Sequence, residues 1–229
     1  ASLVWIANRT DNDSNMSAQT VQVDRLIALR ERNKSFIDIA GYFAFYGVGD
    51  VKLTGEGEPE RLSAVPVSQN FFPLLGVQPI LGRQFSAEEC KWNGPKAALL
   101  THGLWERRFA SDPRIVGKAI RLDDAPVTVV GVMPASFDFG AIFAPGAHIY
   151  FFYPFALSKE TNRWGNTLAL VGRLKPDAHL PRAQAEADIL GDQISAEHPN
   201  ENDIHPKLTF LHEHISGRLR PALWILGCA

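Results

Sequence analysis

The sequence has few cysteines, little net charge and no long apolar run. Its 229 residues contain two cysteines, Cys90 and Cys228, which cannot form a disulfide framework, so we expect both thiols to be free. A formal net charge of -2 supplies no basic face for nucleic acid. No apolar run approaches the roughly 20 residues that span a bilayer, and no secretory signal is visible. A hydrophobic content of 45% is typical of a folded chain with one large core or two modest ones.

The motifs that usually carry catalysis are also missing. The sequence contains no G-x-S-x-G element and no phosphate-binding loop, and the glycines around Gly47 and Gly55 do not follow the dinucleotide-binding spacing. Asp123 and Asp124 are adjacent carboxylates, but sequence neighbours in a turn seldom converge on one substrate. We therefore predict no enzymatic activity, no catalytic residue and no cofactor.

Three histidines near the end of the chain support an alternative. His212 and His214 stand two apart in a predicted strand, Lys207–Glu213, where both imidazoles would point to one face. His205 is close enough in sequence to supply a third zinc ligand. The alternative hypothesis is a metal-dependent hydrolase that uses these three residues, although the polar face of a strand explains them as well.

Hydrophobic periodicity predicts two similar outer segments, each a strand, a helix and a strand. The first has a strand at Leu3–Ala7, a helix over about residues 19–33 and a strand at Phe36–Val48, followed by another at Arg61–Val67. The second has a strand at Leu168–Leu174, a helix over Pro181–Glu197 and the strand Lys207–Glu213. Two βαβ units of this kind build a split, ferredoxin-like α+β layer.

From about Ser86 to Arg163 the sequence is mostly short strands and turns, which predicts a separate lobe, and turn and capping signals occur both before and within it. Ser68 suits the N-cap of a short helix, which Gly76 would end in a left-handed conformation. Ser86 and Glu89 have the spacing of a capping box. Residues 119–132 read as a β-hairpin that turns at Asp123.

The stretch from Arg61 to Pro134 carries a family resemblance. It contains V-P-V-S-Q-N-F-F-P-L-L-G-V-Q-P-I-L-G-R-Q-F, then a helix with L-W-E-R-R-F, then D-P-R-I-V-G, and finally V-V-G-V-M-P. These elements resemble, in content and order, the extracytoplasmic domain of MacB/FtsX-type ABC transporter permeases. The matching residues that we expect to have structural roles are Phe71, Phe72, Gly76, Gly82, Arg83, Trp105, Asp112, Pro113, Gly117, Gly131 and Pro134.

The resemblance implies a fold and a division into parts. The fold class would be α+β, with two βαβ units forming a porter-like subdomain and a mainly β subdomain inserted between them. The expected parts are residues 1–85 and 165–216 of the porter-like subdomain, and 86–164 of a Sabre-like insert. Residues 217–229, apolar after Arg218 and Arg220, would begin a truncated transmembrane helix.

The resemblance also implies a role outside the cytoplasm. The domain would pass ATP-driven motion of transmembrane helices to partners or cargo on the outer side of a cell membrane. Its partners would be a second permease copy or homologous subunit, a cytoplasmic ABC ATPase, and a periplasmic adaptor or exported cargo, with no nucleic acid among them. The remaining alternative is a freestanding extracellular binding module. We expect the domain by itself to be a monomer.

Overall fold

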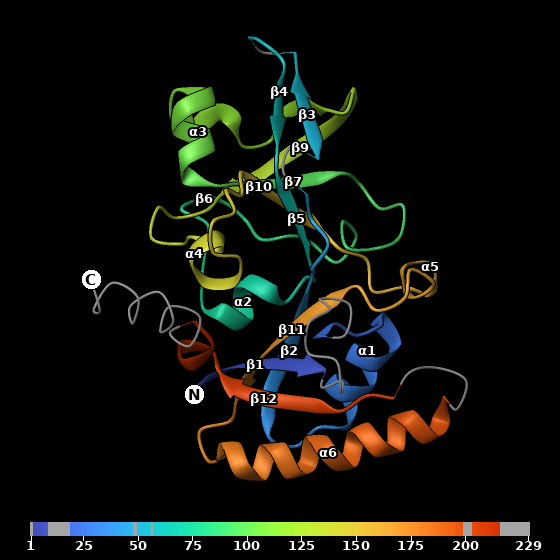
Figure 1. Cartoon of the computed structure of the whole chain (residues 1–229). Helices are drawn as coiled ribbons and strands as arrows, with labels where there is room; N and C mark the ends of the chain where they lie inside the picture. Colours follow the sequence, from blue (N-terminus) through green and yellow to red (C-terminus); the bar gives the residue numbers. More distant parts are fainter. Residues whose placement is uncertain (1, 9–18, 48–49, 56, 199–202, 216–229) are drawn as a thin grey trace, which may run out of the picture. The chain divides into compact units, whose positions relative to one another are not determined.

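The chain forms two compact units. The computed structural model describes residues 2–8, 19–47, 50–55, 57–198 and 203–215 (Figure 1). The first unit comprises residues 1–40 and 165–229, and the second comprises residues 41–164. The subdomain bounds expected from the resemblance remain a prediction, whereas compact packing places the start of the second unit at Gly41. The reason is long-range pairing, since the strands of residues 51–67 pair with strands of residues 119–154.

The first unit is a four-stranded antiparallel layer with two helices. Its elements are β1 (Leu3–Asn8), α1 (Val23–Arg32), β2 (Phe36–Phe43), β11 (Leu168–Leu174), α6 (Leu180–Glu197) and β12 (Pro206–Phe210). The strand order is β12-β1-β11-β2, and β1 is antiparallel to both of its neighbours. Each βαβ unit is therefore split by a strand of the other, which confirms the predicted ferredoxin-like arrangement.

The core of the first unit lies between the sheet and its helices. Ile6 of β1 and Leu208 of β12 share a face of the sheet and meet Leu29 of α1 and Ala187 of α6. Helices α1 and α6 also contact each other. The small residues Ala183 and Ala187 let α6 approach the sheet closely, and burial of these apolar side chains stabilises the layer.

One side-chain amide covers part of an edge of this sheet. Gln184 of α6 accepts a hydrogen bond from the amide of Leu208 (2.8 Å) and donates one to the carbonyl oxygen of Pro206 (2.7 Å). The amide thus pairs with the backbone of β12 as a neighbouring strand would. Edge strands with unpaired backbone groups invite pairing with other chains, so this contact protects β12.

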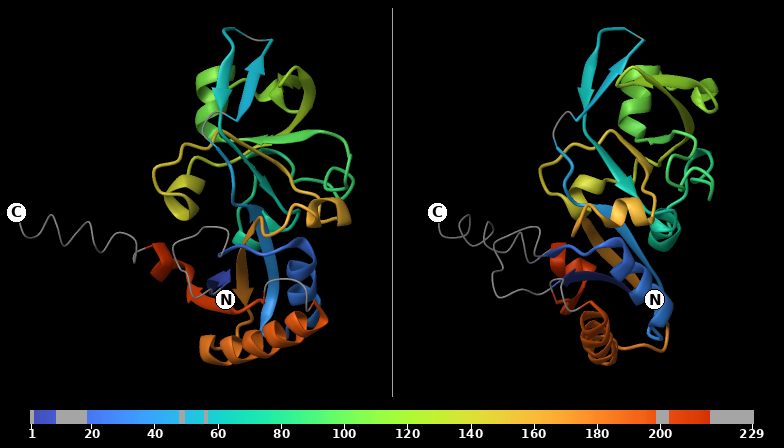
Figure 2. Two further views of the ribbon diagram at one scale, coloured as in Figure 1. Left: turned by 45° about the vertical axis from the view of Figure 1, so that its right-hand side comes forward. Right: turned by 90° about the vertical axis from the view of Figure 1, so that its right-hand side faces the viewer.

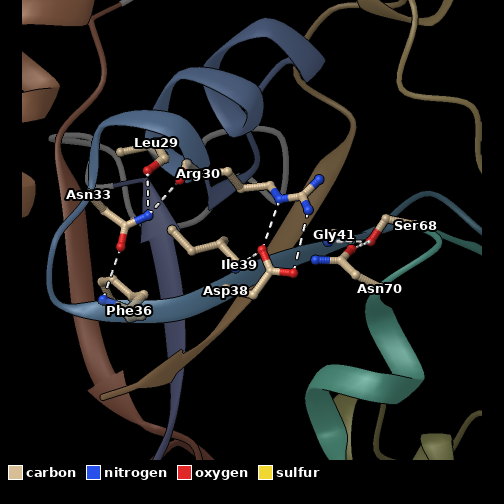
Figure 3. Close-up of polar contacts among 9 residues, drawn as sticks. All are labelled: Leu29, Arg30, Asn33, Phe36, Asp38, Ile39, Gly41, Ser68 and Asn70. Carbon is tan, nitrogen blue, oxygen red and sulfur yellow. Dashed lines mark hydrogen bonds and ion pairs between the residues drawn. The ribbon is translucent and has the colours of Figure 1, made fainter.

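The turn between α1 and β2 is fixed by polar side chains (Figure 3). The Asn33 side-chain amide donates to the carbonyl oxygens of Leu29 (2.9 Å) and Arg30 (2.8 Å) in the last turn of the helix, and the Leu29 oxygen also accepts from the Asn33 backbone amide. Its oxygen accepts from the amide of Phe36 at 2.9 Å. Arg30 then reaches Asp38 of β2 at 3.0 Å, which ties the helix to the strand that follows it.

The second unit is built from short strands. They are β3 (Val51–Thr54), β4 (Glu60–Leu62), β5 (Ala64–Val67), β6 (Leu81–Gly82), β7 (Ala97–Leu100), β8 (Ala119–Leu122), β9 (Ala125–Val132) and β10 (Phe151–Pro154). Their order is β5-β10-β7-β9-β8-β3-β4, with residues 41–43 of β2 next to β5 and β6 paired to β9. The predicted hairpin is present as β8 and β9, with Asp123 and Asp124 at positive φ in its turn.

Short helices complete the second unit. They are α2 (Phe71–Leu75), α3 (His102–Phe109), a 3-10 turn at Pro113–Ile115, α4 (Phe139–Phe143) and α5 (Lys159–Asn162). Figure 2 shows α3 beside the β3–β4 hairpin. Arg107 of α3 pairs with Glu60 of β4 at 2.6 Å, and its guanidinium lies over the Tyr150 ring. These contacts fix the hairpin against the rest of the unit.

The two faces of β10 pack into different clusters. Phe152 contacts Phe72 edge-to-face at 5.0 Å and belongs to an aromatic group that includes Phe139. Phe151 points the other way, into an aliphatic cluster with Leu100, Leu62 and their neighbours. Since successive residues of a strand face opposite sides, the run of aromatics in β10 holds both clusters together.

Several local predictions differ from the structure. Strand β2 ends at Phe43, not at Val48. The predicted strand Arg61–Val67 is divided at Ser63, whose carbonyl oxygen accepts from the amide of Tyr150 at 3.0 Å. Among the described residues, no helix is both long and apolar enough to cross a membrane. The expected transmembrane start at residues 217–229 falls outside the part of the chain that the structure describes.

Ser68 does not cap a helix as predicted. Helix α2 begins at Phe71, and Asn70 occupies its N-cap position without a side-chain cap. The Ser68 hydroxyl accepts from the amide of Gly41 (3.0 Å) and donates to the Asn70 side chain (2.8 Å), as Figure 3 shows. A backbone group in β2 therefore competes successfully for the hydroxyl group.

Candidate functional site

The first group of family-motif residues lies in α2 and in the segment that follows it, as far as β6. Phe71 and Phe72 are fully buried, and their rings meet edge-to-face at 5.3 Å. Gly76 ends α2 in the left-handed conformation, φ 71°, as the sequence predicted. Gly82 lies in β6, where an added Cβ would meet the Val130 carbonyl oxygen at 2.2 Å. These positions are constrained by packing and close backbone approach.

Arg83 is part of an ion pair with a capping function. It contacts Glu89 through both terminal nitrogens, at 2.7 and 2.9 Å. Glu89 accepts from the amide of Ser86 (2.8 Å), and the Ser86 hydroxyl accepts from the amide of Glu89 (3.3 Å), so the predicted capping-box contacts are present. The hydrogen bond from Arg83 lowers the pKa of the Glu89 carboxyl below its ordinary value. The neighbouring Cys90 is a free thiol, and burial raises its pKa to about 11.

The residues of the D-P-x-x-x-G element form a turn that follows α3 in the chain. The Trp105 indole N–H donates to the carbonyl oxygen of Asp112 at 3.0 Å. The Asp112 carboxylate caps the 3-10 turn that begins at Pro113 by accepting from the amide of Arg114. Hydrogen bonds from Arg114, first its side chain and then its amide, lower the pKa of Asp112 to about 2. Gly117, at φ 86°, closes the turn and donates to the Val129 carbonyl oxygen.

Gly131 and Pro134 end strand β9. An added Cβ on Gly131 would lie 2.7 Å from the Leu81 carbonyl oxygen, so only glycine lets β6 approach β9 here. The Pro134 carbonyl oxygen accepts from the amide of Phe137 at 3.0 Å. Together, the motif residues contact backbone and core, and none of them lines the cavity described below.

The histidine site requires a correction. The predicted strand Lys207–Glu213 ends at Phe210, and residues 211–215 are helical. On a helix, residues two apart do not share a face, so the reason for grouping His212 with His214 is removed. His214 stacks on Trp5 at 4.4 Å, and the His205 amide donates to the Asn8 side chain. Within the described ranges, no three His, Cys, Asp or Glu side chains come close enough to hold a metal ion.

A cavity of about 490 Å³ opens in the second unit, where β7 and β10 diverge. The two strands pair only at Leu99, Leu100, Phe151 and Phe152. Beyond this point Pro154 has no amide hydrogen to donate, and the strands separate. No sequence pattern indicated this cavity, because its lining comes from four separated stretches near residues 43–66, 89–97, 122–127 and 151–164.

One wall of the cavity is aromatic. Trp164 is the centre of this wall, and its ring contacts those of Trp92 (5.9 Å), Phe155 (6.0 Å) and Phe43 (6.2 Å) edge-to-face. Trp92 and Trp164 remain 42% and 52% exposed, so they present apolar surface to the opening. Aromatic rings and a volume of this size are typical of sites for small ligands.

The remaining lining carries a few polar groups. Tyr153 lies in the floor, where burial raises its pKa to about 12, followed by the negative charges of Asp50 and Asp123. The phenol is therefore neutral at physiological pH. In the described part of the chain, no group forms a hydrogen bond with its hydroxyl. Lys96 and Asp123 are the other charged lining residues outside the Arg83–Glu89 and Lys91–Glu88 ion pairs.

Comparison with known proteins identifies a family and a fold. The model of the family described as MacB-like periplasmic core domain matches residues 2–190. The fold is similar to the periplasmic region of MacB from Actinobacillus actinomycetemcomitans, with a TM-score of 0.65 and 12% identity over 96% of this chain and 93% of that one. No curated protein sequence matches the chain.

Two further solved structures share the fold. One is the extracellular domain of the noncanonic ABC-type transporter YknZ from Gram-positive bacteria, with a TM-score of 0.62 and 10% identity over 90% of this chain and 99% of that one. The other is a domain of a putative permease from Porphyromonas gingivalis, with a TM-score of 0.65 and 16% identity over 91% and 89%.

Proposed function

We propose, from the premise that this chain belongs to the MacB-like periplasmic core domain family, that it transmits ATP-driven motion of a permease to partners outside the cytoplasm. The family is the extracytoplasmic domain of MacB/FtsX-type ABC transporter permeases and not an enzyme class. The match over residues 2–190 is the observation that carries the proposal. The proposal assigns no catalytic residue to the chain.

The two units fit this role because each has a buried core of its own. Ile39 and Leu190 are buried in the first unit, and Phe71 and Phe152 in the second. Units with separate cores move relative to each other unless a large apolar interface prevents it. We assign the first unit to the porter-like subdomain and the second to the inserted subdomain. The motif residues around Gly82 and Trp105 would then keep the inserted subdomain rigid.

The proposed partners follow from the transporter context. They are a second permease copy or a homologous subunit, a cytoplasmic ABC ATPase that acts through membrane helices of the parent protein, and an adaptor or exported cargo on the outer side. The fold would be held at the outer face of a cell membrane. The family match supports this context without selecting among cargoes.

Distance measurements between two copies of the parent permease test the proposal. A spin label at Ile189→Cys, an exposed position on α6, would be introduced after Cys90 and Cys228 are changed to serine. In membranes with the ATPase present, we expect the label-to-label distance distribution to change between nucleotide-free and ATP-bound states. An ATPase variant that cannot bind ATP should abolish this change. The same distribution in every nucleotide state would refute the proposed transmission of motion.

A further inference from the structure

We propose that the cavity between β7 and β10 binds a small organic cation with an aromatic or branched apolar body. This inference goes beyond the proposed function, because it depends on the cavity of the second unit alone. The distance measurements in the parent permease test the transmission of motion, and calorimetry on the chain tests ligand binding. Failure of one proposal is therefore detected independently of the other.

Size and lining set the apolar part of the ligand. A volume of about 490 Å³ is in the range of small-molecule sites, which are mainly apolar with a few placed polar groups. Phe43, Phe155 and Trp164 form a connected set of rings at one wall. Trp92 and Trp164 leave large parts of their surface in water, and a bound apolar body would cover this surface.

The aromatic rings favour a positive charge. The face of an aromatic ring is the negative end of its quadrupole, so it attracts a cation and repels an anion. A cation within about 6 Å of a Trp ring centroid gains this attraction. Trp92 and Trp164 are the strongest such partners among the side chains of the cavity.

The fixed charges favour the same sign. Glu89 and Lys91 are neutralised by Arg83 and Glu88, at 2.7 and 2.6 Å. The Asp123 carboxylate is held in the turn because it accepts a hydrogen bond from the backbone amide of Lys52 at 2.9 Å. It acts on Tyr153 together with Asp50, so two carboxylates contribute negative potential at the floor.

Two remaining groups modify this preference. Lys96 lines the cavity and opposes a cation, but its ammonium is exposed on a flexible stem and can turn toward water. The neutral Tyr153 hydroxyl has a free lone pair and can accept a hydrogen bond from an ammonium group. The balance of rings, carboxylates and hydroxyl therefore selects a cation over an anion of the same shape.

Tetraphenylphosphonium and tetraphenylborate test the charge preference, since these ions have nearly the same shape and opposite charge. Each would be titrated into the 229-residue chain by isothermal calorimetry. We expect the cation to bind about tenfold more tightly than the anion. Equal or tighter binding of the anion, or no saturable binding of the cation at millimolar concentration, would overturn the proposal.

Matched variants locate the binding. Trp164→Ala should weaken cation binding about tenfold through loss of ring contact. Asp123→Asn keeps an oxygen that can accept from the Lys52 amide, and this variant should weaken cation binding about threefold. Lys96→Gln should strengthen cation binding slightly. Ile189→Ala, an exposed apolar truncation in the first unit, is the control and should have no effect. Circular dichroism verifies the fold of each variant. Unchanged affinity in both Trp164→Ala and Asp123→Asn would place binding elsewhere and refute the inference.

Discussion

Substituting two glycines of the family motif by alanine distinguishes the cost of backbone strain from the cost of a steric clash. Gly82 and Gly117 both have positive φ, 76° and 86°, so alanine is strained at either position. An added Cβ at Gly117 meets nothing within 4 Å, whereas at Gly82 it would lie 2.2 Å from the Val130 carbonyl oxygen and 2.8 Å from Gly131 Cα. Both contacts at Gly82 are with backbone, which cannot rotate away.

The expected magnitudes follow from these contacts. Gly117→Ala should lower the free energy of unfolding by about 1–2 kcal/mol, the cost of a left-handed conformation for an L-residue. Gly82→Ala carries the same cost and also forces β6 away from β9. That movement would break the hydrogen bonds from Ile80 to Val132 (2.8 Å) and from Arg83 to Val130 (2.9 Å). Two such bonds contribute about 1–3 kcal/mol, so Gly82→Ala should cost about 2–5 kcal/mol in total.

Urea unfolding measures both variants. Tryptophan fluorescence has contributions from Trp92, Trp105 and Trp164 of the second unit and from the buried Trp5 of the first, so replacing Trp5 by phenylalanine in the background of both variants makes it report more selectively on the second unit. Far-ultraviolet circular dichroism reports on both units, and non-coincident transitions would show that they unfold separately. If Gly82→Ala and Gly117→Ala had the same free energy of unfolding within about 0.5 kcal/mol, the close approach of β6 to β9 would not have the importance assigned to it.

Two further predictions concern polar contacts. Gln184→Ala should lower the free energy of unfolding of the first unit by about 1–3 kcal/mol, because two hydrogen bonds to β12 are lost. Exposed Gln193 on the same helix provides a control substitution to alanine, and equal effects in chemical unfolding would contradict the edge-pairing role. The pKa of Glu89 is lower in the folded state, so its ionised carboxylate contributes stability above the ordinary pKa of a glutamate. This contribution is lost as the pH falls through the pKa of the folded state. Arg83→Met should therefore flatten the loss of stability between pH 6 and about pH 3, and an unchanged pH profile would disprove the coupling.

Local sequence signals determined many elements of this protein. The short apolar run of residues 168–174 and the apolar face of residues 181–197 predicted β11 and α6 closely, because both patterns act over a few residues. The left-handed Gly76, the capping contacts of Ser86 and the turn at Asp123 were also readable, since each depends on immediate neighbours. The motif order from Arg61 to Pro134 was sufficient to identify the family.

Other features were decided only by contacts between distant residues. The unit boundary at Gly41 depends on pairing of β3 with β8 and of β5 with β10, which no local pattern specifies. Ser68 bonds to Gly41, 27 residues away, instead of capping the adjacent helix. The cavity combines side chains from Phe43 to Trp164. Periodicity describes which face of an element is apolar, but which elements meet is determined by the packing of the whole chain.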